Sequence, residues 1–445
     1  MSPARRWLLL WLFLWLALAA FVAVRATWRP DHRGVLLDHL EFGRRLLHGE
    51  NVYADWRSDP DAPLRPLHAP YPPSFGLLTA PFALVADAVS LRAARLCWAL
   101  LQILALAAIA RALRELLGTG ADPPTARAHR WLLLGALLLL SRFVLRDTHG
   151  GGGNLINVAL CALAFAAAER GHAVRAGWWL GFSLATKPTQ IWLLPVLLLL
   201  GHRRAALHTV AAGLLCTLLS LLLLRCDPAP WLRWLDGSLQ LAAQPDAFAV
   251  PALGFPEFEW MNQSLRCACA RWLGTVPSEF AARVNLGVWP GLGLAPAAAA
   301  WTARSLIAVS LCAVLFAAHR CRGAAAPSRA LVFAAALTFS LLPSPLTWGA
   351  HHVALLPLVY LLLESLLLEH AVRARSRATC LLLLSFALCC GFGQEIVGPD
   401  GEEWRNSLYV LPMFDLALLA AALCLALRTR DASRTHEVAA PAPAR

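Results

Sequence analysis

The sequence is poor in charged residues and contains a single lysine, Lys187. Asp, Glu, Lys and Arg make up 15% of the 445 residues, whereas hydrophobic residues make up 58%. A water-soluble domain carries a charge on about a quarter of its residues, so this composition excludes a soluble enzyme. The formal net charge of +12 comes from arginines in short loops between apolar runs, which indicates membrane topology rather than binding to nucleic acid. We expect an integral membrane protein.

The apolar runs lack the strict alternation of apolar and polar residues that marks the strands of a membrane β-barrel. Helix is then the fold that satisfies the backbone polar groups in lipid. A transmembrane helix needs about 20 apolar residues, and the sequence predicts an all-α, polytopic membrane protein with about twelve transmembrane helices, or ten. The twelve runs are residues 7–24, 72–91, 94–112, 131–146, 154–169, 176–200, 205–224, 299–318, 330–343, 350–368, 378–393 and 408–427.

The sequence also lacks the motifs of several soluble enzyme classes. No glycine-rich nucleotide loop follows a strand, no paired carboxylates form a metal motif, and no serine or cysteine stands in a nucleophile setting. Most of the 12 cysteines lie inside apolar runs, where cysteine acts as a small hydrophobe, so we expect no metal and no cofactor. Cys226, Cys267 and Cys269 share one polar loop, and a disulfide among them is an alternative if that loop is periplasmic.

Arginines assign the loops to the two sides of the membrane. Arg5 and Arg6 precede the first apolar run, and no small-residue cleavage site follows it. We therefore expect an uncleaved anchor with a cytoplasmic N-terminus, with a cleaved signal peptide as the alternative. The positive-inside rule also places four later arginine clusters in the cytoplasm, at residues 203–204, 320–329, 373–377 and 428–434.

The polar segments define the expected organisation. We expect one membrane domain over residues 1–430, with external loops at 25–70 and 225–293, and a disordered cytoplasmic tail at 431–445. Apolar residues at helical spacing predict a helix at 35–48 that lies along the membrane surface.

The number of crossings decides the side of the basic loop from Arg111 to Arg130. Twelve crossings place this loop outside, whereas ten crossings, with 72–91 and 176–200 re-entrant, place it inside. We favour twelve on the lengths of the runs. With either number the two long loops and the turn from Pro343 to Trp348 share one external face, and we expect the active site there, at the plasma (inner) membrane.

Two acids of the first external loop, Asp31 and Asp38, are the candidate catalytic residues. A carboxylate at the membrane interface acts as a general base on a sugar hydroxyl if it stays ionised. Asp31 follows Pro30 and starts the predicted surface helix, whereas Asp38 lies within it, three residues before Glu41. The alternative is that each acid is a solvated surface charge or a helix cap.

Several short strings, taken in order, resemble glycosyltransferase family 87 over roughly residues 25 to 360. That family belongs to the membrane GT-C superfamily of polyprenyl-phosphate-sugar-dependent transferases, and its best-known members are mannosyltransferases. The strings are Phe42 to Tyr53, Tyr71-Pro72-Pro73, Gly153-Asn154, Ala176-Gly177 to Lys187-Pro188, Asn262-Gln263-Ser264 with Arg271, and Ser344 to Trp348 with His351-His352.

The resemblance implies an external aspartate as catalytic base, and we rank Asp31 slightly ahead of Asp38 because it lies nearer the end of the first span. Two strings depart from the family pattern. Gly152 stands where the family has glutamine, although Asn154, a candidate substrate-binding residue, is retained. The turn from Trp348 to His352 carries one extra residue, which can change the histidine that faces the site.

The implied chemistry expels a lipid-linked phosphate, and cations near that phosphate stabilise the developing charge. The available groups are Lys187, Arg271, His351 and His352. The alternatives are a snorkelling lysine, which extends to the interface, and structural histidines.

Polar and aromatic side chains in the same strings are candidates for the sugar. Asn262 and Gln263 offer hydrogen bonds to hydroxyls, and Trp348 or Trp260 offers a ring to stack on the sugar face. The alternatives are a chance glycosylation sequon at Asn262 and an aromatic belt at the interface for the tryptophans.

We therefore expect an inverting hexosyltransferase, with mannose as the first candidate sugar. It would transfer the hexose from a polyprenyl-phosphate donor to an external glycan or glycolipid acceptor, among membrane lipids and without nucleic acid. The lack of a nucleotide loop favours the lipid-linked donor. One alternative is a lipid or polysaccharide transporter, which would depend on Lys187, Glu364 or Asp415 inside the spans. Another is a GT-C-like scaffold that has lost its site.

Overall fold

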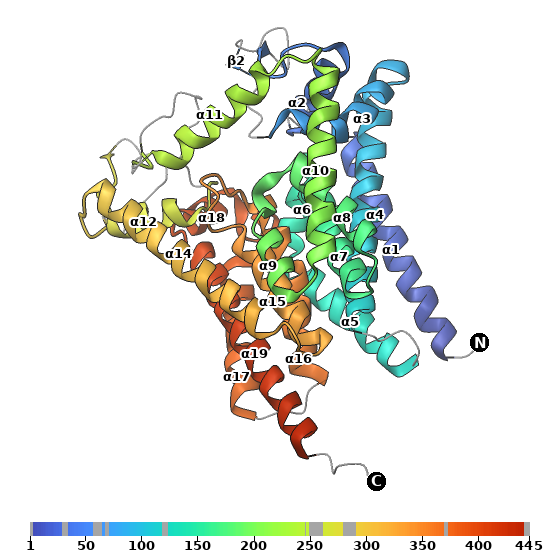
Figure 1. The fold of residues 1–445 in the computed structure, drawn as a ribbon, viewed down its shortest axis with the longest axis vertical. Helices are drawn as coiled ribbons and strands as arrows, with labels where there is room; N and C mark the ends of the chain where they lie inside the picture. The colour runs from blue at the N-terminus through green and yellow to red at the C-terminus, as the bar shows by residue number, and fades with distance from the viewer. Residues whose placement is uncertain are drawn as a thin grey trace.

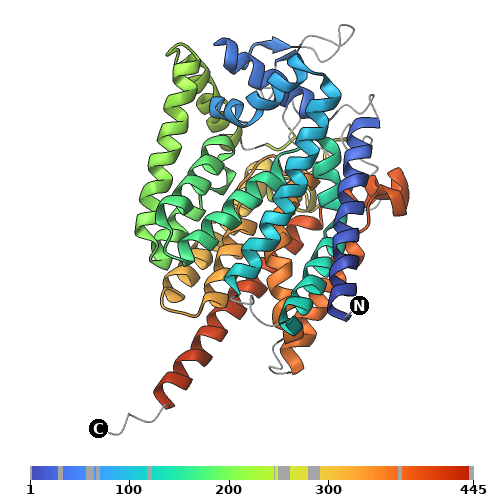
Figure 2. The same cartoon turned by 90° about the vertical axis from the view of Figure 1, so that its right-hand side faces the viewer.

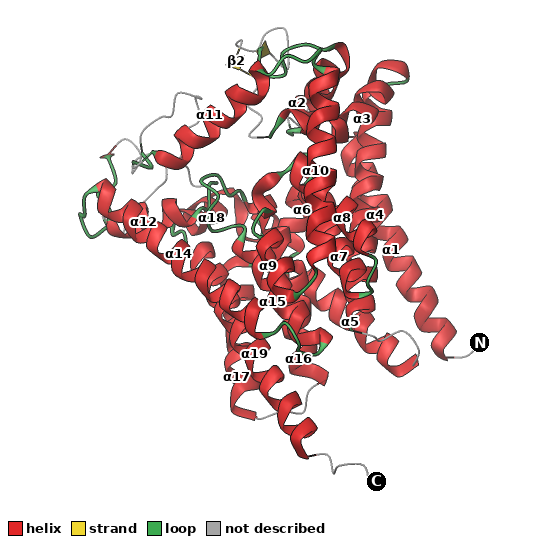
Figure 3. Ribbon diagram, in the orientation of Figure 1, coloured by secondary structure: helices red, strands yellow, loops and turns green. Residues whose placement is uncertain are grey.

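The computed structural model describes residues 3–28, 34–56, 65–66, 71–117, 123–244, 246–248, 261–278, 291–368 and 373–439. Over these residues the chain forms a bundle of long and short helices (Figures 1 and 3). The described part contains one small sheet, in which β1 (Asp55–Trp56) pairs antiparallel with β2 (Arg65–Pro66). The predicted all-α, polytopic class is confirmed.

The helices of the N-terminal half are α1 Pro3–Trp28, α2 Leu36–His48, η1 Pro73–Phe75, α3 Gly76–Ala88, α4 Leu91–Leu116, α5 Pro123–Leu139, α6 Ser141–Gly150, α7 Asn154–Glu169, α8 Ala173–Thr186, η2 Pro188–Gln190, α9 Leu193–Leu200 and α10 Arg203–Leu223. Those of the C-terminal half are α11 Ala229–Ala243, α12 Leu265–Leu273, α14 Pro296–Arg320, α15 Ala326–Phe339, η3 Gly349–Leu355, α16 Leu356–Leu368, α17 Arg373–Cys390, α18 Gln394–Ser407 and α19 Leu411–Ala439.

Five helical segments are long and apolar enough to cross a membrane: α4, α10, α14, η3 with α16, and α19 up to Thr429. A sixth candidate consists of α5 and α6, which meet at a bend of 70°. The other apolar helices are shorter, with 10 to 17 residues. The length and composition of these segments agree with a multi-pass membrane protein.

Both termini lie toward one end of the bundle, which we call the lower end from its place in Figures 1 and 2. Ion pairs join helix ends there: Arg170 lies 3.0 Å from Glu115, and Arg329 donates to Glu169 at 3.0 Å. These contacts bring the C-terminal ends of α4 and α7 to the start of α15. The C-terminal end of α4, with Arg111 and Arg114, therefore belongs to the lower end.

The apolar run 176–200 is broken rather than continuous. α8 leads away from the lower end, and α9 returns to it beside His202, whose Nε2 lies 2.9 Å from Glu169. Pro188 follows Lys187 at the break, and a residue before proline is disfavoured in a helix. The prediction of one straight span is corrected here, because the segment is a hairpin with Lys187 at its tip.

The run 72–91 is likewise not one long helix. α3 has 13 residues and turns into α4 at the upper end of the bundle, opposite the termini (Figure 1). It packs closely on α2, because a Cβ at Gly43 would lie 2.6 Å from the Ala80 nitrogen and a Cβ at Gly76 would lie 2.6 Å from Leu46. Glycine is required at such a close approach of two helices.

The helix expected at 35–48 is present as α2, and much of its apolar face packs inside the protein. Leu36, Leu40 and Leu46 are buried within the protein. The Val35 amide donates to the Gly150 carbonyl at 2.9 Å, so the start of α2 is attached to the turn between α6 and α7. This attachment places α2 above that turn at the upper end.

The last helix extends further than expected. α19 continues to Ala439, so helix reaches into the segment 431–445 that the sequence analysis expects to be disordered.

Candidate functional site

Asp147 links two helices at the upper end. It lies in α6 and is fully buried, and its carboxylate accepts hydrogen bonds from the Asn154 side-chain amide at 2.6 Å and from the Leu155 amide at 2.9 Å. Both donors belong to the first turn of α7. The first N–H groups of a helix have no partner within the helix and favour a negative charge. Asp147 therefore fixes the start of α7.

Position 152 has no room for a side chain in this structure. A Cβ at this position would lie 2.1 Å from Asp147 Oδ1. The Gly152 carbonyl is also held in place, since it accepts hydrogen bonds from the side chains of Trp98 and Gln102. The carboxylate of Asp147 thus occupies the space that a side chain at position 152 would need.

Lys187 meets this arrangement from the tip of the α8–α9 hairpin. Its ammonium group donates to the side-chain oxygen of Asn154 and lies 5.3 Å from the centre of the Tyr71 ring. Asn154 therefore stands between a carboxylate and an ammonium group, with its NH₂ toward Asp147 and its oxygen toward Lys187. Lys187 is buried, and the opposite charge of Asp147 compensates in part for the removal of its charge from water.

A small pocket opens beside the Lys187 ammonium, between η1, α3, α7 and α8. Its lining is mostly apolar, and Lys187 is the cation among the lining residues. The wall on the α7 side is fixed by polar contacts, because Asn157 bonds to both Ser183 and Gln190. The lining residues are Tyr71, Phe75, Leu78, Gly153, Ile156, Asn157, Leu160, Thr186 and Lys187.

Two neighbouring residues of α2 lie close to Lys187 and Tyr71. His39 is buried, and its ring centre lies 4.9 Å from that of Phe75 and 5.5 Å from that of Tyr71. Burial, together with the charge of Lys187, lowers the pKa of His39 to about 3, so this ring is neutral at pH 7. Asp38 is half-buried. Burial, with the nearby carboxylates of Asp147 and Asp38, raises the pKa of Tyr71.

The turn from Trp348 to His352 approaches from the other half of the chain. His351 Nδ1 accepts a hydrogen bond from the Trp348 amide at 3.0 Å, and Lys187 is within electrostatic reach of this ring. His352 points elsewhere: its Nε2 lies 3.1 Å from Asp415 Oδ2 in α19. We call Asp147, Asn154 and Lys187, with Tyr71 and His39, the lysine cluster.

Asn262 and Gln263 form a second arrangement. Asn262 donates to the Pro345 carbonyl at 2.9 Å and accepts from the Thr347 amide at 2.8 Å. Gln263 donates from its side chain to the Asn406 carbonyl at 2.9 Å. These side chains attach the segment to the backbone of the Ser344–Trp348 turn and of α18.

Arg271 extends this arrangement. It is buried, donates to the Ser407 carbonyl at 3.3 Å, and lies 5.3 Å from the centre of the Trp272 ring. We call Asn262, Gln263 and Arg271 the loop clamp. Their predicted contacts with sugar and phosphate stay predictions.

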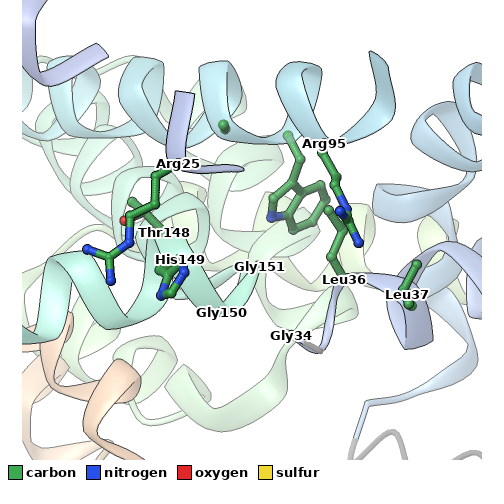
Figure 4. A pocket seen from close by; sticks show the side chains of 11 residues that line it. Arg25, Gly34, Leu36, Leu37, Arg95, Thr148, His149, Gly150 and Gly151 are labelled. Atoms are coloured by element: carbon green, nitrogen blue, oxygen red, sulfur yellow. The ribbon is translucent and has the colours of Figure 1, made fainter. Parts of the chain in front are cut away.

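A second pocket lies on the other side of the α6–α7 turn and is shown in Figure 4. Arg25 lies beside His149 at one side of this pocket, and Arg95 lies at the other side near Leu36 and Leu37. The pocket is thus the more basic of the two. Its lining residues are Arg25, Gly34, Leu36, Leu37, Arg95, Trp98, Ala99, Thr148, His149, Gly150 and Gly151.

The sequence predicts Asn154 and Lys187 as candidate substrate-binding residues, and the structure brings their side chains into contact. Asp147 and His39 of the same cluster are not among the residues predicted from the sequence. The available signal for Asp147 was an acid at the end of an apolar run, seven residues before Asn154 and followed by glycines. Asp31 and Trp260 lie outside the described residues. Cys226, Cys267 and Cys269, the three cysteines considered for a disulfide, are not joined to one another by a disulfide in the described part of the chain.

Comparison with known proteins agrees with the resemblance. The profile of glycosyltransferase family 87 matches residues 69–345. Among solved structures, the chain is similar to ArnT from Cupriavidus metallidurans bound to undecaprenyl phosphate, at 16% identity and a TM-score of 0.36, over 96% of this chain and 79% of that one. The apo state of the same protein gives 16% identity and a TM-score of 0.38, over 95% and 78%. None of the curated proteins matches this chain.

Proposed function

Because the chain belongs to glycosyltransferase family 87, we propose that it transfers a hexose from a polyprenyl-phosphate donor to an acceptor hydroxyl outside the cytoplasm. Mannose is the first candidate sugar, since the family's best-known members transfer it, and the acceptor is a glycan or glycolipid. The product has the inverted configuration at the anomeric carbon, since one displacement forms the new bond opposite the one that breaks.

The observation that carries this proposal is the buried ammonium group of Lys187 beside a largely apolar pocket. In the described part of the chain one of its three N–H groups is bonded to Asn154, and an ammonium group has two more to donate. A lipid-linked phosphate matches this combination, because its charge needs a cation and its first isoprene units need an apolar wall.

Lys187 and His351 act on the leaving group, which is the phosphate of the donor. When the bond between the anomeric carbon and the phosphate oxygen breaks, negative charge collects on the phosphate. Preorganised donors aimed at that charge lower the barrier, and they act most strongly where water is excluded. Lys187 provides a full charge, and His351 provides the Nε2–H that remains when its Nδ1 accepts from the Trp348 amide.

The acceptor side needs a base. Asp38 lies on α2, whose start is attached to the α6–α7 turn through Val35 and Gly150. As the acceptor oxygen bonds to the anomeric carbon, its proton passes to the carboxylate of Asp38 or Asp31. This assignment keeps both acids as candidates.

The upper end of the bundle is the external face in this proposal. The arginine clusters at 203–204 and 320–329 lie at the lower end, where α10 and α15 begin, and such clusters mark the cytoplasmic side. The lysine cluster, α2 and the Trp348 turn belong to the upper end. A polyprenyl donor in the outer leaflet of the plasma membrane is thereby within reach of them.

The direct test is transfer by the purified protein in lipid nanodiscs, with radiolabelled polyprenyl-phosphate mannose and a series of mannosylated lipids as acceptors. The expected result is label in the acceptor, and its loss in the double variant Asp31→Asn/Asp38→Asn. The matched control is Asp400→Asn, which removes an exposed acid of α18 and leaves transfer unchanged. No transfer by the native protein, or full transfer by the double variant, contradicts the proposal.

A further inference from the structure

The two adjacent histidines have different surroundings. His351 is half-buried and uses Nδ1 to accept from the Trp348 amide. His352 is fully buried, with its ring centre 5.4 Å from that of Phe143. The residue of the first ring is partly exposed, and the second ring is enclosed by the bundle.

Both hydrogen-bond partners of His352 are acceptors. Its Nδ1 lies 3.2 Å from the Trp348 carbonyl oxygen, and its Nε2 lies 3.1 Å from Asp415 Oδ2. A carbonyl oxygen and an ionised carboxylate have no proton to donate. For both contacts to be hydrogen bonds, Nδ1 must carry a proton that it donates to the Trp348 carbonyl, and a second proton must lie between Nε2 and Asp415 Oδ2.

Asp415 needs this partner. It belongs to the candidate span of α19 and is 1% exposed, and its Oδ1 has no hydrogen-bond partner within the described part of the chain. A carboxylate inside a span is costly unless it is paired, and acids retained there mark function more often than stability. The hydrogen bond with His352 Nε2 gives Asp415 this partner.

We infer that Asp415 is a positioning residue that acts through His352: the pair fixes the Trp348 carbonyl, and with it the turn that presents His351 to the leaving phosphate. This inference rests on the proposed function. In this inference His351 contacts the substrate, whereas His352 contacts only groups of the protein. Asp415 contributes to transfer by holding His352 in position, and it does not touch the substrate.

The first test is a spectroscopic one that does not depend on activity. The protein is labelled with ¹⁵N-histidine, reconstituted in lipid at pH 8 and measured by solid-state NMR, and the His352 signals are identified by their loss in His352→Gln. The Nδ1 of His352 is expected to carry a proton in the native protein, and the Nε2 signal is expected to shift in Asp415→Asn, because an amide replaces the carboxyl partner of Nε2. An Nδ1 without a proton in the native protein, or an Nε2 signal that is the same in both proteins, overturns the inference.

The second test is kinetic. Asp415→Asn is expected to lower kcat for transfer by about 100-fold, the order of loss that a displacement of about 1 Å produces, with the KM for the donor unchanged. His352→Gln should give the same loss, and the double variant no further loss, because residues acting as one unit are not additive. The matched control is Glu364→Gln, which removes another acid from the apolar α16 and is expected to transfer normally.

The outcomes separate this inference from the proposed function. A native protein that transfers no sugar contradicts the proposed function. A native protein that transfers sugar, with an unchanged kcat in Asp415→Asn or additive losses in the double variant, contradicts the positioning role alone. If His352→Gln is too unstable for assay, the kcat of Asp415→Asn relative to that of the native protein decides between these outcomes.

Discussion

The lysine cluster and the loop clamp use similar side chains in different ways. In the clamp, the side chains of Asn262 and Gln263 bond to backbone groups of a turn and of α18. In the cluster, Asn154 bonds to the side chains of Asp147 and Lys187. Bonds between two side chains are the minority in proteins, and most side-chain bonds go to backbone or water.

This difference separates a scaffold from a site. A side chain that satisfies backbone groups holds the chain in one shape, and its amide has little left to offer a ligand. The ammonium group of Lys187 keeps donors for a ligand while Asn154 and Asp147 fix its position. We therefore expect changes in the cluster to affect transfer first, and changes in the clamp to affect stability first.

The largest effect is expected for Lys187→Gln. Glutamine keeps a donor for Asn154 and removes the charge that faces the leaving phosphate. Loss of one electrostatic donor of this kind lowers kcat by about 100- to 1,000-fold. Transfer assays and thermal unfolding of the same preparation provide the measurement. A lower melting temperature of Lys187→Gln, with normal transfer by the protein that remains folded, would contradict the expected role of the lysine cluster in transfer.

The clamp is expected to respond in the opposite way. Asn262→Ala leaves the Thr347 amide and the Pro345 carbonyl without this partner, and each buried polar group left unsatisfied costs about 1–3 kcal/mol. The expected result is a lower melting temperature with a smaller change in kcat than in Lys187→Gln. Ser365→Ala is the control, since it removes a local hydroxyl that bonds within α16. A stable Asn262→Ala protein without transfer would place Asn262 on the substrate instead.

Gly152→Ala tests whether the cluster depends on the space at position 152. The new Cβ would lie 2.1 Å from Asp147 Oδ1, so the carboxylate must move, and overpacking of this kind costs about 1–3 kcal/mol. Loss of transfer is expected together with a moderate loss of stability. Gly150→Ala is the control on the same turn, because its Cβ meets nothing within 4 Å. Equal behaviour of the two variants contradicts the steric explanation.

The sequence was informative where the signal is local. Apolar runs predicted the helical class, and short strings placed Asn154 and Lys187 among the site residues. The break at Lys187 also had a local signal in Pro188, which the span prediction did not use. Length alone favoured one straight helix.

Other contacts of the site join residues that are far apart in the sequence. Asp415 contacts His352 because α19 packs beside a turn 63 residues earlier. Such pairings depend on how helices pack. The hydrogen bonds of the Asn262 side chain likewise join it to the backbone of a turn more than eighty residues away.

A smaller effect is expected from pH, and of the two arrangements it concerns the lysine cluster, which contains His39. Burial, together with Lys187, holds the pKa of His39 at about 3, below its ordinary value of 6.5. Below pH 6.5 His39 takes up a proton in the unfolded chain but stays neutral in the folded protein. The free energy of unfolding therefore decreases as the pH falls toward 3. The loss for this group is about 2 kcal/mol between pH 7 and pH 5.

His39→Gln isolates this contribution, because glutamine does not titrate. The melting temperature of the native protein is expected to fall between pH 7 and pH 5, and the variant should show a flatter profile even if it is less stable at pH 7. His48→Gln, which changes an exposed histidine of the same helix, should keep the native profile. Asn262→Ala should also keep it, because the clamp residues Asn262, Gln263 and Arg271 include no histidine. Parallel profiles for the native protein and His39→Gln would mean that the ring is protonated in the folded state, and that Lys187 is not close enough to oppose it.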